Sequence, residues 1–396
     1  MAFAFVNGRV LQPSGFVEGL AVLVDGNRIV DVLPTNDARV RQIEHRDLHG
    51  QLLLPGFIDT QVNGGGGVLF NDDPGIESIR AIGRAHRRFG TTGFLPTLIS
   101  DDLHVVENAI AAVQAAIDAG VPGVLGIHIE GPFLNAERKG VHDAAKLREL
   151  DESGLQLLTS LHGGKTLITL APEMTTPQII RRLAEAGMIV SAGHTNATYA
   201  EIRAALDHGL RGFTHLFNAM SQLTGREPGV VGAALDDSSS WCGIILDGLH
   251  VDPVALRIAL RSKPRDRFML VTDAMPSVGI DGDEFMLQGR RIIVRDGKCL
   301  DENGTLAGSH LSMAEAIANA QRMLHLDLAE CVRMASEYPA AFLGLQNELG
   351  RIAPGYRASL VQADDRLNVI ETWIDGRPSA RAAVEHSAAA TVTAEP

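Results

Sequence analysis

The sequence predicts an α/β protein: a TIM-type (β/α)8 barrel with a small β-sandwich domain formed by both chain ends. From residue 56 onward, short apolar runs alternate with amphipathic segments of helical period, and eight such runs can be counted. Three of these runs deliver a glutamate or a histidine at or just past their carboxyl end, where a parallel barrel carries its chemistry. A doubly wound open sheet is the alternative, but the GxGxxG turn expected after its first strand is missing.

The two ends of the chain are predicted to be β structure. In residues 1–53, short β-rich runs flank an Asp25-Gly26 hairpin signal, and no helix of useful length fits. Residues 346–378 return to this pattern, so we expect both segments to form one small β domain. The segment 379–396 is rich in Ala, Thr and Ser and is expected to be disordered.

The barrel is expected to occupy residues 54–345. Within 102–119, for example, Val106, Ile110 and Val113 recur at helical spacing. A β insertion near 280–306 is expected to interrupt the alternation before the last helices. The predicted strands are 56–62, 93–99, 123–130, 166–171, 188–193, 212–216, 241–246 and 268–273, and the predicted helices are 74–89, 102–119, 176–186, 199–208, 252–261, 312–324 and 329–336.

Composition excludes several classes of function. The chain has 396 residues, 45% hydrophobic and 21% charged, which suffices for a large core. Its net charge of −13 argues against nonspecific binding to nucleic acid or anionic lipid, so no membrane or nucleic-acid partner is expected. Three scattered cysteines exclude a disulfide framework and favour a reducing, cytoplasmic location. No apolar run reaches transmembrane length, and no secretory signal is visible.

Glu130, His194 and His215 are the predicted metal ligands. Each lies at or just past the carboxyl end of a predicted strand. A single histidine is more often a buried, hydrogen-bonded residue, but three such groups at equivalent strand ends would be brought together by a barrel. A carboxylate and two imidazoles that leave one position open for water define a catalytic zinc site. A metal there lowers the pKa of its water to about 7 and polarises a substrate carbonyl.

Asp273 ends the eighth predicted strand and would face the same side of the barrel. It is either a turn-capping residue or a general base that takes a proton from water and returns it to a leaving group. Gln61 and Asn63 end the first strand, where many barrel hydrolases carry a His-x-His pair. Because neutral amides are weak Zn²⁺ ligands, we interpret them as the remnant of a second site and expect one metal.

Three further residues are candidates for substrate contact. His250, after the seventh strand, could stabilise an oxyanion by hydrogen bonding. Arg226 and His142 taken singly have ordinary structural explanations, but on so acidic a chain they are candidate anchors for a phosphate.

With these residues in place, the sequence resembles the amidohydrolase superfamily and, within it, the N-acetylglucosamine-6-phosphate deacetylase family. The resemblance covers nearly the whole chain, and its motifs are specific in combination rather than singly. They are Leu54-Pro55-Gly56-Phe57-Ile58-Asp59, His128-Ile129-Glu130-Gly131-Pro132-Phe133, Gly193-His194-Thr195-Asn196-Ala197, Thr214-His215-Leu216-Phe217-Asn218-Ala219-Met220, Asp247-Gly248-Leu249-His250, Val271-Thr272-Asp273-Ala274, Leu306-Ala307-Gly308-Ser309 and Gly350-Arg351-Ile352-Ala353-Pro354-Gly355.

The resemblance implies that the metal triad and Asp273 have the roles given above. It also implies one divalent metal per subunit, for which Zn²⁺ is the first choice and Fe²⁺, Co²⁺ or Mn²⁺ are alternatives. It implies a homodimer or homotetramer in which Arg226 reaches a neighbouring subunit's phosphate group. The implied substrate contacts are His142, Asn218, Ala219, Arg226, His250, Leu306, Ala307 and Gly308.

The function expected from this resemblance is metal-dependent deacetylation of N-acetyl-D-glucosamine 6-phosphate, a small-molecule sugar phosphate, in amino-sugar catabolism or cell-wall sugar recycling. Two rivals remain open. One is another barrel amidohydrolase, such as a deaminase or a cyclic-amide hydrolase. The other is a non-enzymatic sensor of sugar phosphates.

Overall fold

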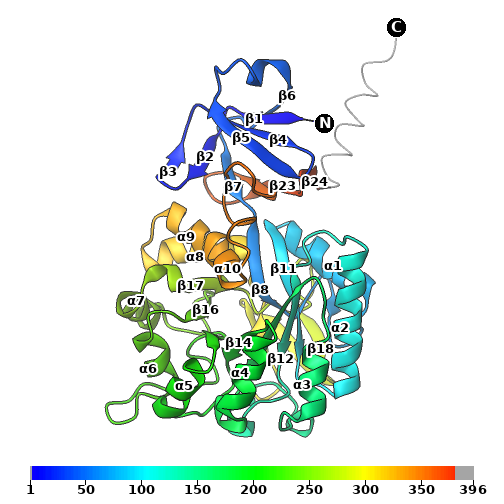
Figure 1. Cartoon of the computed structure of the whole chain (residues 1–396), viewed down its shortest axis with the longest axis vertical. Coiled ribbons are helices and arrows are strands. Elements are labelled where there is room, and N and C mark those ends of the chain that lie inside the picture. The colour runs from blue at the N-terminus through cyan, green and yellow to red at the C-terminus, as the bar shows by residue number, and fades with distance from the viewer. Residues whose placement is uncertain (1, 380–396) are drawn as a thin grey trace.

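The computed structural model describes residues 2–379, and its centre is a parallel eight-stranded barrel sheet (Figure 1). The strands follow one another around the sheet in chain order, which confirms the predicted (β/α)8 fold. They are β8 (Phe57–Val62), β11 (Thr91–Ile99), β12 (Gly126–Glu130), β13 (Lys165–Leu170), β14 (Ile189–Ala192), β15 (Leu210–Phe213), β16 (Trp241–Ile245) and β17 (Phe268–Val271).

The barrel closes between its first and last strands at their carboxyl ends. There the Asp273 N–H donates to the Gln61 carbonyl across 3.0 Å, and the Asn63 N–H donates to the Ala274 carbonyl across 2.9 Å. Both faces of the strands are covered, which is why they are near-continuous apolar runs rather than alternating ones. Every residue of β11, for example, is buried.

Ten α-helices are described, and those between the strands surround the barrel (Figure 1). Two begin with a complete capping box, Thr198 with Glu201 and Ser312 with Glu315, which satisfies free backbone N–H groups. The helices are α1 (Ile76–Arg87), α2 (Leu103–Asp118), α3 (Glu152–Leu158), α4 (Pro177–Glu185), α5 (Tyr199–Leu206), α6 (Gly229–Asp236), α7 (Pro253–Ser262), α8 (Met313–Leu324), α9 (Leu328–Ala335) and α10 (Glu337–Phe342).

Both chain ends contribute strands to a small β domain at one end of the molecule, as predicted (Figure 1). One sheet contains β1 (Phe3–Val6), β4 (Leu20–Asp25), β5 (Arg28–Pro34) and β6 (Glu44–Asp47). The other contains β2 (Arg9–Gln12), β3 (Gly15–Val17), β7 (Leu52–Pro55), β22 (Leu360–Ala363), β23 (Val369–Ile374) and β24 (Arg377–Pro378). The edge-to-face contact of Phe5 with Trp373, with ring centroids 4.7 Å apart, joins the two sheets. The predicted disordered segment lies outside the described residues, apart from Ser379.

A four-stranded antiparallel sheet is inserted between β17 and α8. It comprises β18 (Glu284–Leu287), β19 (Arg290–Arg295), β20 (Lys298–Leu300) and β21 (Leu306–Ser309). At its first turn, the Gln288 amide donates to the Ser100 carbonyl across 2.9 Å, and Arg290 donates to the Val141 carbonyl. A short hairpin, β9 (Gly64–Gly65) with β10 (Val68–Leu69), follows the first barrel strand. Both additions therefore lie beside the carboxyl ends of the barrel strands.

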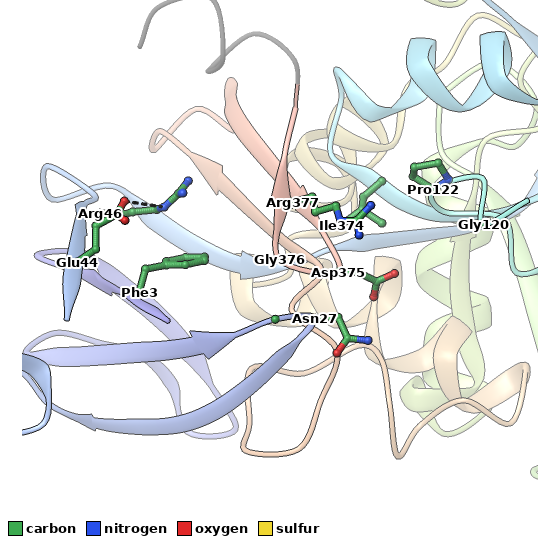
Figure 2. A pocket seen from close by; sticks show the side chains of 11 residues that line it. Phe3, Asn27, Glu44, Arg46, Gly120, Pro122, Ile374, Asp375, Gly376 and Arg377 are labelled. Atoms are coloured by element: carbon green, nitrogen blue, oxygen red, sulfur yellow. Dashed lines mark ion pairs between the residues drawn. The ribbon is translucent and has the colours of Figure 1, made fainter. Parts of the chain in front are cut away.

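No helix within residues 2–379 is long and apolar enough to cross a bilayer. The largest cavity described, about 790 Å³, lies between the small domain and the loop before β12 (Figure 2). Of its charged side chains, Arg46 stacks on Phe3 at 4.3 Å and Asp375 pairs with Arg357 at 2.6 Å. None of the predicted site residues lines this cavity.

Candidate active site

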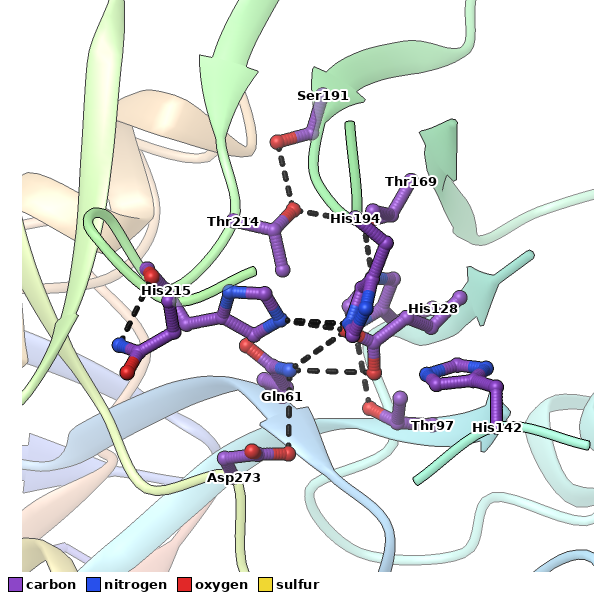
Figure 3. Close-up of polar contacts among 12 residues, drawn as sticks. Gln61, Thr97, His128, His142, Thr169, Ser191, His194, Thr214, His215 and Asp273 are labelled. Carbon is purple, nitrogen blue, oxygen red and sulfur yellow. Dashed lines mark hydrogen bonds and ion pairs between the residues drawn. The ribbon is translucent and has the colours of Figure 1, made fainter. Parts of the chain in front are cut away.

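Glu130, His194 and His215 meet at the carboxyl end of the barrel. Figure 3 shows the two histidines of this group. Glu130 ends β12, and the two histidines follow β14 and β15. Glu130 Oε1 lies 3.2 Å from His194 Nε2 and 3.0 Å from His215 Nε2, and the two Nε2 atoms are 3.0 Å apart. All three side chains are buried. Both histidines have left-handed backbone, with φ of 50° and 37°. The structure thus brings the three predicted ligands together.

The donor set of this triad fits a divalent cation. His194 Nδ1 lies 2.9 Å from the Arg138 carbonyl, which can only accept, so Nδ1 carries a proton and the Nε2 of a neutral ring presents a lone pair. That lone pair faces a carboxylate oxygen and a second Nε2, so three electron-rich atoms converge within 4.8 Å. Within residues 2–379 this is the one such group of three His, Cys, Asp or Glu ligands.

The electrostatics also call for positive charge at the triad. Burial alone would raise the pKa of Glu130, but hydrogen bonds with His194 and His215 hold it well below its ordinary value. Burial opposes a charge on His215, yet the Glu130 carboxylate raises the pKa of that ring. An ionised carboxylate is therefore stable here only beside protonated imidazoles or a cation.

Asp273 lies just past β17, beside the triad (Figure 3). Its Oδ1 accepts hydrogen bonds from Asn63 Nδ2 at 2.6 Å and Gln61 Nε2 at 3.1 Å. Burial, with the negative charge of Glu130, raises the pKa of Asp273 to about 6. A carboxyl group with a pKa near neutrality can both accept and return a proton.

Gln61 and Asn63 donate hydrogen bonds to the carboxylates of the site. Gln61 Nε2 lies 3.2 Å from both oxygens of Glu130, in addition to its contact with Asp273. An ionised carboxylate only accepts, so the NH₂ faces of both amides must point toward the acids. The two amides thus hold Glu130 and Asp273 at a fixed separation.

A cavity of about 200 Å³ opens over these groups. It brings together most of the residues proposed to contact substrate. Arg226, by contrast, is exposed in the loop before α6, and Ala307 is buried beneath the wall, so neither lines the cavity. The lining comprises Asn63, Ile99, Glu130, Gly140, Val141, His142, His194, His215, Asn218, Ala219, Ile245, His250, Asp273, Met275, Thr305, Leu306 and Gly308.

Two histidines of the lining have their orientation fixed by a neighbour. The Ser100 N–H donates to His142 Nδ1 across 3.2 Å, so in the neutral ring Nε2 carries the proton. Burial and the nearby His194 lower the pKa of His142 well below its ordinary value, which keeps that ring neutral. His250 Nδ1 instead pairs with Asp247 Oδ2 at 2.6 Å.

The sequence reasoning above assigned no function to Ser100, Asp247, Asp59 or Thr272. Ser100 and Asp247 orient histidines of the cavity, while Asp59 bonds to Thr272 at the barrel closure. Two of these residues have a sequence feature that could have drawn attention to them. Asp59 is a carboxylate within an apolar run, and Asp247 stands three residues before His250. No sequence feature distinguishes Ser100 or Thr272, because buried hydroxyls are common in barrel strands.

Comparison with known proteins agrees with this geometry. The sequence model of the amidohydrolase family matches residues 52–378. An N-acetylgalactosamine-6-phosphate deacetylase of Shewanella sp. (strain ANA-3) is 45% identical over 93% of this chain and 93% of its own length. An N-acetylglucosamine-6-phosphate deacetylase of Haemophilus influenzae is 36% identical over 95% and 99%. The crystal structure of N-acetylglucosamine-6-phosphate deacetylase from Pasteurella multocida superposes with a TM-score of 0.92 at 38% identity, covering 96% of this chain and 100% of that one.

Proposed function

The chain belongs to the amidohydrolase family, and we propose that it hydrolyses the amide of N-acetyl-D-glucosamine 6-phosphate to give acetate and D-glucosamine 6-phosphate. One observation carries the proposal: the Asp273 carboxyl, with a pKa of about 6, is held beside three convergent ligand atoms in a cavity of about 200 Å³. This is the set of groups that metal-assisted amide hydrolysis needs.

Glu130, His194 and His215 would hold one divalent cation per subunit. Zn²⁺ suits a carboxylate and two imidazoles best, and Fe²⁺, Co²⁺ and Mn²⁺ accept the same ligands. When bound, such an ion polarises the amide carbonyl and lowers the pKa of a coordinated water. Gln61, which donates to Glu130, would keep the carboxylate in place for the ion.

Asp273 would carry the proton of the reaction. Its carboxylate takes a proton from the attacking water as the new C–O bond forms. It then delivers that proton to the amide nitrogen as the C–N bond breaks, so that the amino sugar leaves as an amine and acetate remains. His250, whose Nδ1 is held by the Asp247 carboxylate, would face the carbonyl oxygen through Nε2. With a proton on both ring nitrogens, Nε2 would donate to that oxygen while negative charge develops there.

A second substrate is favoured by a specific observation. The relative that shares 45% identity acts, by its name, on N-acetylgalactosamine 6-phosphate rather than the glucosamine epimer. The two sugars differ at the C4 hydroxyl, which is remote from the amide that reacts. The proposed reaction can therefore act on both epimers. Selectivity between them would depend on the residues that line the cavity.

The phosphate of either substrate requires positive charge that the cavity's own lining lacks, because no lysine or arginine lines it. Arg226 is exposed in this chain, in a loop near the helix α6. We infer a homodimer or homotetramer in which Arg226 of one subunit reaches the phosphate in the next. Cytoplasmic amino-sugar catabolism or cell-wall sugar recycling would supply the substrate.

The deciding experiment measures acetate release from four sugars, the glucosamine and galactosamine epimers with and without the 6-phosphate, by purified protein of known metal content. Turnover that requires the phosphate, at about one metal per chain, supports the proposal. The ratio of kcat/KM between the two phosphorylated epimers identifies the substrate. Equal activity without the phosphate would favour another amidohydrolase reaction. Tight binding without acetate release would favour a sensor.

A further inference from the structure

The backbone of Asp273 is left-handed, with φ of +54°. Asp adopts this conformation more readily than most residues, and here contacts on both sides of the residue hold the backbone in it. The Asp273 N–H donates to the Gln61 carbonyl, and its own carbonyl accepts from the Ser309 N–H at 2.9 Å. These bonds fix its own peptide groups. The groups on either side of it are held by a second set of contacts.

Asp59, fully buried in β8, supplies that second set. Its Oδ1 accepts from the Gln61 N–H at 3.1 Å and the Thr272 N–H at 3.3 Å, and its Oδ2 accepts from the Thr272 hydroxyl at 2.6 Å. The Thr272 hydroxyl in turn accepts from the Ala274 N–H at 3.2 Å. One carboxylate and one hydroxyl thus hold the residues before and after Asp273.

Burying the Asp59 carboxylate at the barrel closure costs free energy, because the charged group is removed from water. Burial raises the pKa of Asp59 to about 7, and the negative charge of Asp273 adds to that shift. Three donors converge on its two oxygens, which favours the ionised form. A neutral side chain at position 59 would pack in the barrel without this desolvation cost. The cost therefore indicates that Asp59 has a role beyond packing.

We infer that Asp59, acting through the hydroxyl of Thr272, is a positioning residue that aims the Asp273 carboxylate at the reacting groups. The inference rests on the proposed function for its readout, because Asp273 is the proton carrier there. It predicts that the hydroxyl of Thr272 matters for turnover although it lies outside the cavity lining.

The test compares Thr272→Val, Thr272→Ser and Asp59→Asn by kcat, KM, metal content and Tm. Valine keeps the shape and loses the hydroxyl, so kcat should fall by about 10- to 100-fold while KM and metal content stay near wild type. Serine keeps the hydroxyl and should restore most of kcat. Asp59→Asn should lower kcat as Thr272→Val does, and the double variant should lose little more than the worse single one.

Thr91→Val is the matched control, because the Thr91 hydroxyl is buried in β11 without a hydrogen-bond partner. Its kcat should remain at wild type. If folded, metal-loaded Thr272→Val kept kcat within about twofold, the inference would be overturned. If Thr272→Val fails to fold, a folded, metal-loaded Asp59→Asn with kcat within about twofold of wild type would overturn the inference.

A wild-type chain that releases no acetate would overturn the proposed function instead. The positioning inference would then be judged from crystal structures of wild type and Thr272→Val. Movement of the Asp273 carboxylate away from Asn63 and Gln61 in the variant supports it. An unmoved carboxylate overturns it.

Discussion

Asp247 Oδ2 lies 2.6 Å from His250 Nδ1, and both side chains are more than nine-tenths buried at the edge of the catalytic cavity. The Asp247 carboxylate also accepts the backbone N–H groups of Leu249 and His250, so its position is fixed by three donors. Burial would raise the pKa of Asp247, but the His250 ring and these N–H groups hold it below its ordinary value. The pair therefore fixes the orientation of the His250 ring.

Asp247→Asn should lower kcat/KM by about 10- to 100-fold, because the ring loses the charge that orients it. Metal content should stay at wild type, since Asp247 is not a ligand of the triad. Steady-state kinetics with metal analysis of the same sample checks this. A variant with wild-type kcat/KM would show that His250 needs no such orientation.

Asp273→Asn should lower kcat by about 10²- to 10⁴-fold, the usual contribution of a general acid–base group. Asparagine matches the shape but cannot take the proton. Metal binding should survive, because the triad is unchanged, and metal analysis of the variant distinguishes this from loss of the ion. Near-native kcat would assign the proton transfer to another group.

The acid side of the pH–rate profile should report Asp273. Burial raises its pKa to about 6, and only the ionised form accepts a proton, so kcat/KM should fall tenfold per pH unit below the apparent pKa. A bound divalent cation favours the carboxylate and moves this limb to lower pH. If the acid limb of the wild-type profile had an apparent pKa above about 7, the assignment of this limb to Asp273 would be contradicted.

Arg226→Ala should raise KM for the phosphorylated sugar by about tenfold or more, which corresponds to the loss of a hydrogen bond to a charged group. Activity on the unphosphorylated sugar should not change. Arg181, also exposed and lying on α4, provides the matched control as Arg181→Ala. Light scattering measures the oligomer. A monomer with unchanged KM in Arg226→Ala would exclude the shared site.

Asp59 should make wild type less stable as pH rises. Its pKa is about 7 when folded against 3.8 for the ordinary side chain, so the folded state holds an extra proton between these values. The free energy of unfolding of wild type should therefore fall by about 3 kcal/mol relative to Asp59→Asn between pH 4 and 7. Denaturant titrations of both proteins at each pH measure this. Parallel curves for the two proteins would contradict the raised pKa.

The barrel and the metal triad could be predicted because both depend on local patterns. Apolar runs define the strands, and the strand ends place Glu130, His194 and His215 without knowledge of any contact. Three helices were not predicted. α6 contains two glycines and forms because its residues pack in the core, while α3 and α10 are short helices of 7 and 6 residues, about two turns each, set by context.

The remaining site features depend on pairs that are far apart in the chain. Asp59 and Thr272 are separated by 213 positions, so no local pattern joins them. The left-handed backbone of His194, His215 and Asp273 is only weakly indicated by residue type, although Asp and His adopt it more often than most residues. Arg226 could be proposed as a contact, but a single chain leaves it exposed.

The pairing of β7 with β22 has a consequence for how the chain is made. The barrel elements from β8 to α10 precede β22 in the chain, so a ribosome delivers Glu130, His194, His215 and Asp273 before the last strands of the small domain emerge. A nascent chain at that stage carries all four proposed site residues beside a β7 strand that is not yet paired with β22. Until β22 is made, this unpaired edge is open to wrong association.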